Sequence, residues 1–295
     1  MDLALSLDDQ IAELAEEVGA DGPITIAGLA TRGGPVPGVR TVMAPSGIAL
    51  VLPEEMTVRC GAGTPVADLD AMLAQHGQSV AIPPTGTVGG ALAVGHSGIR
   101  RLGYGPIRDT VLQVRYVSAA GEVVKSGGAT VKNVSGFDLC RLMVGSRGTL
   151  GFLADVILRT RPRAPFEQWY VTDRPPAEVQ RELYRPTSLL WDGTSVWALL
   201  EGHADDVTAQ AASAGLVAAG DPPVLPTGGR WSLPPSELGK LVGTGRFVAE
   251  LGIGVVHHEL AAPARPVDAP VAELHRRIKH EFDPAGRLNP GVEVL

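Results

Sequence analysis

The chain has 295 residues, 44% of them hydrophobic and 19% charged, which is enough for one large or two moderate soluble domains. Its formal net charge of −7 argues against nucleic acid as a partner, because a phosphate-binding face normally shows as a basic excess. No apolar run reaches the roughly 18 residues of a membrane span, and the acidic start lacks the regions of a signal peptide, so we expect no direct membrane insertion.

The predicted elements of the first part of the chain alternate with glycine-containing turns. Apolar residues at helical spacing predict an amphipathic helix over residues 9–18. A short buried strand over 23–27 runs into the turn 28–34, which is a candidate phosphate cradle because glycine lets backbone N–H groups approach an anion closely. The elements that follow are strands over 48–53 and 56–60 and a helix over 66–73.

The turn at residues 61–63 has part of a dinucleotide-binding fingerprint. It lies between a strand and a helix, as a Rossmann turn does. However, Val66 replaces the third glycine, and no acidic residue follows at the expected distance. A structural turn is therefore the favoured interpretation over a Rossmann fold.

The most unusual stretch is Pro83–Gly98, with the sequence PPTGTVGGALAVGHSG. Five glycines and two prolines in these sixteen residues leave no room for an ordinary helix or strand. A run of turned N–H donors is a concavity for anions, and pyrophosphate is the commonest anion that needs one. A surface loop that is only rich in glycine is the alternative.

The glycine-rich turns end at residues 161–165, which we interpret as a domain boundary. Before this point we expect a hairpin of 111–117 and 122–124, a short helix over 139–144 and a strand over 152–160. After it, the pattern predicts a strand over 166–173, a helix over 175–184, two strands within 188–200, a helix over 204–218 and a last helix over 271–282. The β-α-β-β-α order is typical of a small α+β module. We therefore predict domains over 1–162 and 163–269, with a C-terminal helix and turn over 270–295 that return to the first domain.

Three motifs together resemble those of a known family. They are PPTGTVGGALAVGHSG, KNVSGFDLCRLMVGSRGTLG at residues 132–151 and FDPAGRLNPG at 282–291. Their order and spacing are similar to those of the FAD-linked oxidases of the vanillyl-alcohol oxidase/p-cresol methylhydroxylase (PCMH) type, and within them to the FAD-binding second subunit of bacterial glycolate oxidases. The resemblance implies an α+β FAD domain of two subdomains, with a small ferredoxin-like α+β cap domain over the flavin.

By motif position, the resemblance also implies which residues hold FAD. The pyrophosphate and ribityl chain would lie on the glycine loops, the adenine near a later turn, and one residue would return from the C-terminus. The implied set is Gly28, Thr31, Pro84, Thr85, Gly86, Gly89, Gly90, Ala93, Ser97, Gly98, Lys132, Asn133, Gly148, Leu150, Phe152 and Asn289.

The first glycine loop departs from the family pattern. Leu29 and Ala30 stand where the family is richer in glycine, so we expect this half of the pyrophosphate site to bind more weakly. The loop has no histidine, so we expect non-covalent FAD. His96 stands where related subunits carry an apolar residue, and it is a candidate for contact with flavin or substrate as well as a structural histidine.

Catalytic residues are less evident. Oxidation of a 2-hydroxy acid needs a base for the hydroxyl proton and a cation for the carboxylate, for which Arg230, His257 and His258 are the remaining weak candidates beside His96. No metal site is expected, because HExxH and the family's histidine-rich metal motif are absent. Cys60 and Cys140 have no disulfide spacing, which favours reduced thiols in the cytoplasm.

The leading hypothesis is an FAD-dependent oxidoreductase acting on CH–OH donors, as a subunit of a glycolate oxidase or 2-hydroxyacid dehydrogenase complex. The implied partners are a small 2-hydroxyacid substrate, a second flavoprotein and an iron–sulfur subunit. The expected location is the cytoplasm. Partner subunits that bind the membrane would hold the protein at the inner membrane face. The alternatives are a stand-alone sugar or aldonolactone oxidase and a structural partner that has lost its flavin.

Overall fold

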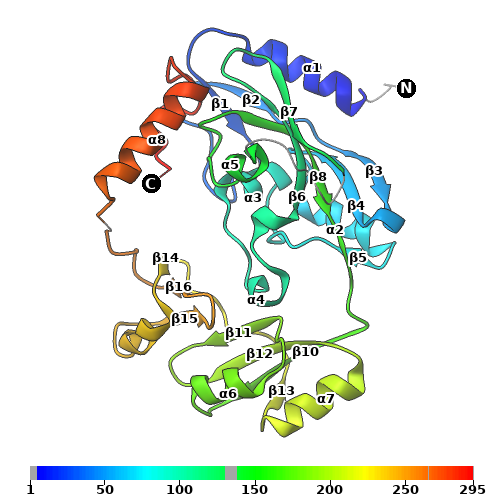
Figure 1. Cartoon of the computed structure of the whole chain (residues 1–295), viewed down its shortest axis with the longest axis vertical. Coiled ribbons are helices and arrows are strands. Elements are labelled where there is room, and N and C mark those ends of the chain that lie inside the picture. Colours follow the sequence, from blue (N-terminus) through cyan, green and yellow to red (C-terminus); the bar gives the residue numbers. More distant parts are fainter. Residues whose placement is uncertain (1–4, 130–137, 265, 295) are drawn as a thin grey trace. The chain divides into compact units, whose positions relative to one another are not determined.

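The computed structural model describes residues 5–129, 138–264 and 266–294. The chain divides into two compact units (Figure 1). Unit 1 contains residues 1–98, 106–163 and 267–295, and unit 2 contains 99–105 and 164–266. The short segment 99–105 therefore groups with the middle of the chain rather than with its sequence neighbours. Within the described ranges, no helix combines the length and the apolar composition that crossing a bilayer requires.

Unit 1 is built on a five-stranded antiparallel sheet with the strand order β3-β4-β8-β6-β7. Strands β1 and β2 form a separate parallel pair, in which β1 precedes the first glycine turn and β2 follows it. Strands β5 and β9 form a short antiparallel pair. The strands are β1 (Ile24–Ala27), β2 (Arg40–Met43), β3 (Ile48–Leu52), β4 (Thr57–Gly61), β5 (Gln78–Ser79), β6 (Val111–Val117), β7 (Val123–Gly127), β8 (Phe152–Arg159) and β9 (Arg161–Pro162). The helices are α1 (Leu7–Val18), α2 (Val66–Ala74), α3 (Val88–Val94), α5 (Leu139–Met143) and α8 (Ala269–Phe282), with 3₁₀ turns η1 (Pro53–Glu55) and η2 (Ile107–Thr110).

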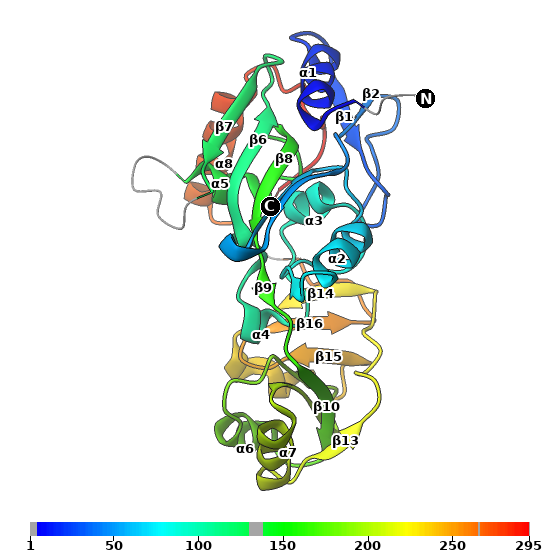
Figure 2. The same ribbon diagram turned by 90° about the vertical axis from the view of Figure 1, so that its right-hand side faces the viewer.

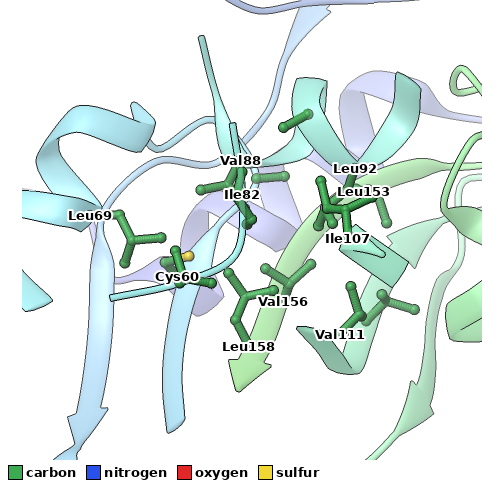
Figure 3. Close-up of a cluster of buried hydrophobic side chains, with 14 of the residues drawn as sticks. Cys60, Leu69, Ile82, Val88, Leu92, Ile107, Val111, Leu153, Val156 and Leu158 are labelled. Carbon is green, nitrogen blue, oxygen red and sulfur yellow. The ribbon is translucent and has the colours of Figure 1, made fainter. Parts of the chain in front are cut away.

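Helix α3 corrects the expectation that the stretch Pro83–Gly98 excludes a helix. Thr87 caps it by accepting a hydrogen bond from the Gly90 N–H, at 3.1 Å. Val88 and Leu92 are completely buried against the sheet, where Figure 3 shows them in one cluster with side chains of β8. Glycine at 89 allows this packing, because a Cβ there would lie 2.7 Å from the Cβ of Ala62. Burial of the apolar face thus outweighs the roughly 1 kcal/mol that each glycine costs in a helix.

A second apolar cluster holds the N-terminal and C-terminal segments to the sheet. Ile11, Leu14 and Val18 form the buried face of α1, as their helical spacing predicts. The helix begins at Leu7, before the predicted residue 9, and Leu7 and Leu288 join the same cluster. Asp283 fixes the chain between α8 and Leu288. Burial alone would raise the pKa of this carboxyl, but hydrogen bonds from Lys279 and from two backbone N–H groups outweigh it and hold the pKa below its ordinary value. The C-terminal turn is therefore anchored in unit 1.

Unit 2 contains an antiparallel sheet of seven strands in the order β13-β10-β12-β11-β15-β16-β14. Figure 2 labels five of these strands, β13, β10, β15, β16 and β14. Its strands are β10 (Phe166–Thr172), β11 (Ser188–Trp191), β12 (Val196–Gly202), β13 (Val217–Ala219), β14 (Gly229–Ser232), β15 (Phe247–Glu250) and β16 (Val255–His258). The helical segments are α4 (Arg101–Tyr104), α6 (Pro176–Glu182), α7 (Ala204–Ser213) and η3 (Pro235–Leu241). The helix expected over 204–218 ends at Ser213, because Gly215 at φ +63° turns the chain into the short edge strand β13.

Candidate functional site

A cavity of about 280 Å³ lies in unit 1, where the first glycine turn meets α3. Main chain can reach much of its wall, because about half of the lining residues are glycine or alanine. The lining residues are 26–34, Val36, Ala44, Ala62, Thr87, Gly89, Gly90, Ala93, Val94, 146–148, 151–153, Asn289 and Val292. A wall of this kind brings backbone N–H and C=O groups close to a ligand. Both glycine-rich stretches of the sequence therefore contribute to one site.

The charge of the cavity is positive although the chain is acidic. Arg32 and Arg147 line it, and none of its lining residues is Asp or Glu. Arg32 donates to Thr85 twice, from Nη1 to the carbonyl oxygen at 2.6 Å and from Nη2 to Oγ1 at 3.2 Å. Burial lowers the pKa of Arg32, but a guanidinium keeps its proton in proteins. A lining that includes Arg32 and Arg147 and no carboxylate residue fits an anionic group such as a diphosphate.

Asn289 connects the C-terminal turn to this cavity. Its Oδ1 accepts hydrogen bonds from Thr25 Oγ1 at 2.8 Å and from the Ile26 N–H at 3.4 Å, and its Nδ2 donates to the Arg147 carbonyl at 2.7 Å. A Cβ at Gly148 would lie 2.6 Å from Nδ2, so glycine is required there. Asn289 thus positions the backbone on two sides of the cavity.

The first glycine turn carries backbone strain at Ala30. This residue has φ +52°, in the left-handed region that glycine occupies at little cost. Leu29 beside it is 57% exposed and lines the cavity. The loop therefore adopts a glycine-type conformation without the glycine, which explains how the departure from the family pattern is accommodated.

Replacing Ala30 by glycine should raise the free energy of unfolding by about 0.5–1 kcal/mol, because relief of left-handed strain exceeds the added entropy of the unfolded chain. The measurement is urea unfolding of the purified protein. Ala12→Gly, at an exposed position of α1, is the matched control and should lower stability by about 1 kcal/mol. Equal losses in the two variants would show that the Ala30 backbone is not strained.

The residues proposed from the motifs separate into three groups. Those that line the cavity are Gly28, Thr31, Gly89, Gly90, Ala93, Gly148, Phe152 and Asn289. Those outside its lining are Pro84, Thr85, Gly86, Ser97, Gly98 and Leu150. Lys132 and Asn133 lie outside the described residues. The second group has other contacts: Thr85 accepts from Arg32, Ser97 Oγ accepts from the Ile107 N–H, and Leu150 belongs to the apolar core.

The weak catalytic candidates are also distinguished by their surroundings. His258 is fully buried and stacks on Trp231 with ring centroids 4.0 Å apart. Its Nδ1 accepts from the Leu260 N–H at 2.9 Å and its Nε2 lies 3.1 Å from Thr244 Oγ1, so both ring nitrogens are engaged within the fold. His257 instead contacts Glu250, with Nε2 3.0 Å from Oε1. His96 is exposed just beyond α3 and does not line the cavity.

Other reactive groups are not organised for chemistry. Burial, with a smaller effect of Asp155, raises the pKa of the Cys60 thiol to about 12, so it is not a nucleophile. Among residues 5–129, 138–264 and 266–294, no three His, Cys, Asp or Glu side chains gather as metal ligands do. Sequence reasoning missed Arg32, Arg147 and Ser146 in the cavity lining. A basic residue within the first glycine turn was the available signal for Arg32.

Known proteins resemble this chain in sequence. Residues 41–127 match the family described as FAD binding domain. Glycolate oxidase subunit GlcE of Escherichia coli (strain K12) is 29% identical, over 83% of this chain and 84% of that protein. D-lactate dehydrogenase of Archaeoglobus fulgidus is 41% identical, but over only 35% of this chain and 24% of that protein. Glycolate oxidase subunit GlcD of Bacillus subtilis (strain 168) is 36% identical over 33% of this chain and 22% of that protein.

The fold has a solved counterpart. The structure of an alkyldihydroxyacetonephosphate synthase superposes with a TM-score of 0.70 over 97% of this chain and 74% of its own, at 15% identity, which shows a common fold. The resemblance that the three motifs predict is confirmed, as are the fold class and the FAD cofactor. The chain therefore carries an FAD-binding domain of the PCMH type and is an FAD-binding oxidoreductase.

Proposed function

We propose that this protein binds FAD without a covalent link and acts as a subunit in the oxidation of a small 2-hydroxy acid such as glycolate. The single observation that supports it best is the cavity in unit 1, whose lining is rich in glycine and alanine, includes Arg32 and Arg147, and contains no Asp or Glu. The similarity to GlcE, which extends over most of both chains, supports the choice of substrate class. Bound FAD would accept the hydride of the CH–OH carbon, which carries the two electrons, while the hydroxyl proton leaves to a base.

The protein's own residues would bind and orient the cofactor. Arg32 and Arg147 would pair with the diphosphate, and the Gly28–Gly34 turn and α3 would approach it with main chain. Asn289 would hold the turn at Arg147 and Gly148 in place. The whole motif-derived set, with Lys132 and Asn133, remains our proposal for the FAD contacts. No histidine occurs in residues 28–34, in keeping with non-covalent attachment.

The assembly is part of the proposal. GlcE and GlcD are named as subunits of glycolate oxidase, which supports a multi-subunit complex for this chain too. We propose a second flavoprotein and an iron–sulfur protein as partners, in the cytoplasm at the inner membrane face. A stand-alone oxidase is the second candidate, and the cluster of polar residues in unit 2 described below favours it.

The first test is an absorption spectrum of the purified protein before and after acid precipitation. In the second, glycolate is added in the absence of oxygen to a separate sample of the native protein, and bleaching of the flavin absorbance is followed. We expect a yellow protein whose flavin leaves with the supernatant, as non-covalent FAD does. Bleaching by glycolate in the protein alone would favour the stand-alone oxidase, and bleaching only with co-purified partner subunits would favour the complex. A colourless protein that takes up no added FAD, or flavin that stays in the precipitate, would contradict the proposal.

A further inference from the structure

One face of the unit 2 sheet carries polar side chains that its apolar core does not use. In β15 and β16, Phe247, Ala249 and Val256 point to the core. Because side chains alternate along a strand, Glu250 and His257 point to the opposite face. Arg230 on the edge strand β14 is the cross-strand partner of His257 and shares that face. Figure 2 shows β14, β16 and β15 as neighbours in this sheet.

Two buried polar atoms on this face have no hydrogen-bond partner. Glu250 is 2% exposed, and while its Oε1 lies 3.0 Å from His257 Nε2, its Oε2 has no partner. Ser188 is fully buried, and its Oγ also has none. They are the only such side-chain atoms among the described residues of the whole chain. Leu190 pairs with Glu250 across β11 and β15, so Ser188, two residues before Leu190, lies diagonally from Glu250 on the same face.

The two unpartnered atoms have complementary chemistry. A carboxylate oxygen accepts hydrogen bonds, whereas a hydroxyl can donate or accept. Buried polar atoms without partners cost free energy, and two that coincide on one sheet face call for a common explanation. A bound polar molecule with a donor and an acceptor would satisfy both.

The charge on this face favours an anion. Arg230 is half-buried, and among the described residues its guanidinium has no hydrogen-bond or ion-pair partner. Burial lowers the pKa of Arg230, Glu250 partly offsets this effect, and Arg101 of α4 adds to the lowering. Arg101 therefore adds to the positive potential at Arg230. The segment that carries Arg101 is packed on the same sheet, since the Gly103 N–H donates to the Thr187 carbonyl at 3.1 Å. Two guanidiniums beside one carboxylate leave an excess of positive charge.

We propose that Arg101, Ser188, Arg230, Glu250 and His257 form a binding site for a small hydroxycarboxylate. The guanidiniums of Arg230 and Arg101 pair with the carboxylate of the ligand, and Glu250 Oε2 accepts the hydrogen bond of its hydroxyl group. Ser188 Oγ donates to the ligand, and His257 holds Glu250 in position through Oε1. This inference deepens the proposed function and rests on it for the choice of glycolate as the ligand.

The experiment is calorimetric titration of the FAD-loaded protein with glycolate and with acetate, which lacks the hydroxyl group. We expect glycolate to bind about tenfold more tightly than acetate. Arg230→Met should weaken both ligands at least tenfold, and Glu250→Gln should weaken glycolate while leaving acetate almost unchanged. Arg246→Met, at an exposed position of the same unit, is the matched control and should change neither. If Arg230→Met fails to fold, Arg230→Lys replaces it, because lysine keeps the charge but loses the two-pronged contact.

Ser188→Ala provides a second readout that does not depend on the flavin. Removing an unpartnered buried hydroxyl should raise the Tm of the ligand-free protein by about 2 °C and weaken glycolate several-fold. Absence of glycolate binding, or unchanged affinity in Arg230→Met, would overturn the site. If the variants weaken glycolate binding but glycolate does not reduce the flavin, the site is supported and the proposed function is contradicted. If glycolate reduces the flavin and Arg230→Met leaves the KM for glycolate unchanged, the proposed function stands and the site is contradicted.

Discussion

Replacement of Arg287 by alanine is expected to lower the free energy of unfolding by about 3–5 kcal/mol. Arg287 is 5% exposed, and its guanidinium donates five hydrogen bonds to backbone carbonyl oxygens at 2.6–2.8 Å. The acceptors lie on two segments far apart in the sequence, the end of α1 and the β6–β7 turn: Val18, Gly19, Asp21, Gly22 and Ala119. Without the guanidinium, several of these carbonyls would be buried and unpartnered, which is the costly outcome.

Chemical denaturation of the FAD-free protein measures this loss. Arg276→Ala is the matched control, because Arg276 is an exposed residue of α8 paired with Glu273, and its loss should cost less than about 1 kcal/mol. Arg287→Lys should recover only part of the stability, since an ammonium has three donors and not five. FAD affinity should fall with stability in Arg287→Ala, because Asn289 follows two residues later and holds the cavity wall. A loss no larger than that of Arg276→Ala would refute this account.

Arg287 also illustrates what local patterns could and could not predict. The motif FDPAGRLNPG indicated consecutive turns and a return to the FAD domain, and Asn289 does line the cavity. The pattern gave no sign that Arg287 is buried, since arginine is mostly exposed and its five acceptors come from residues more than 160 positions away. Partners of that kind depend on the tertiary fold, which local spacing does not contain.

The elements themselves were predicted best where one periodicity dominates. The hairpin of β6 and β7, the apolar face of α1 and the strand β8 follow directly from alternation or helical spacing. Helix α3 was missed because glycine argues locally against a helix, whereas the close approach to Ala62 requires it. The end of α7 was placed too late because alanine favours helix on both sides of Ser213.

The candidate sites show the same division. Glycine-rich motifs identified the cavity, since close backbone approach to a ligand depends on the glycines themselves. The contact between Arg32 and Thr85 joins residues 53 positions apart and had no local signal. Glu250 was not a candidate at all, because its role depends on the pairing of β15 with β16, which brings His257 to its carboxylate.

Replacement of Arg32 by alanine is expected to weaken FAD binding about 10- to 100-fold and to leave riboflavin binding unchanged. The reason is that a charge-assisted hydrogen bond from a guanidinium to a phosphate oxygen contributes about 1.5–3 kcal/mol, and riboflavin has no phosphate. Thr85 holds the Arg32 guanidinium by two hydrogen bonds, so the cation is already oriented before the ligand arrives. FMN, with one phosphate, should show an intermediate loss.

Quenching of flavin fluorescence measures the three affinities with the same apoprotein. Arg159→Ala is the control, because Arg159 is exposed on β8 and does not line the cavity. In the wild type, FAD affinity should decrease as salt is raised, and Arg32→Ala should reduce this dependence, since one of the two cavity cations is gone. If Arg32→Ala weakens riboflavin as much as FAD, Arg32 acts by folding the loop onto Thr85 and not by pairing with the diphosphate. A selective loss of FAD would instead assign the electrostatic part of cofactor recognition to this guanidinium.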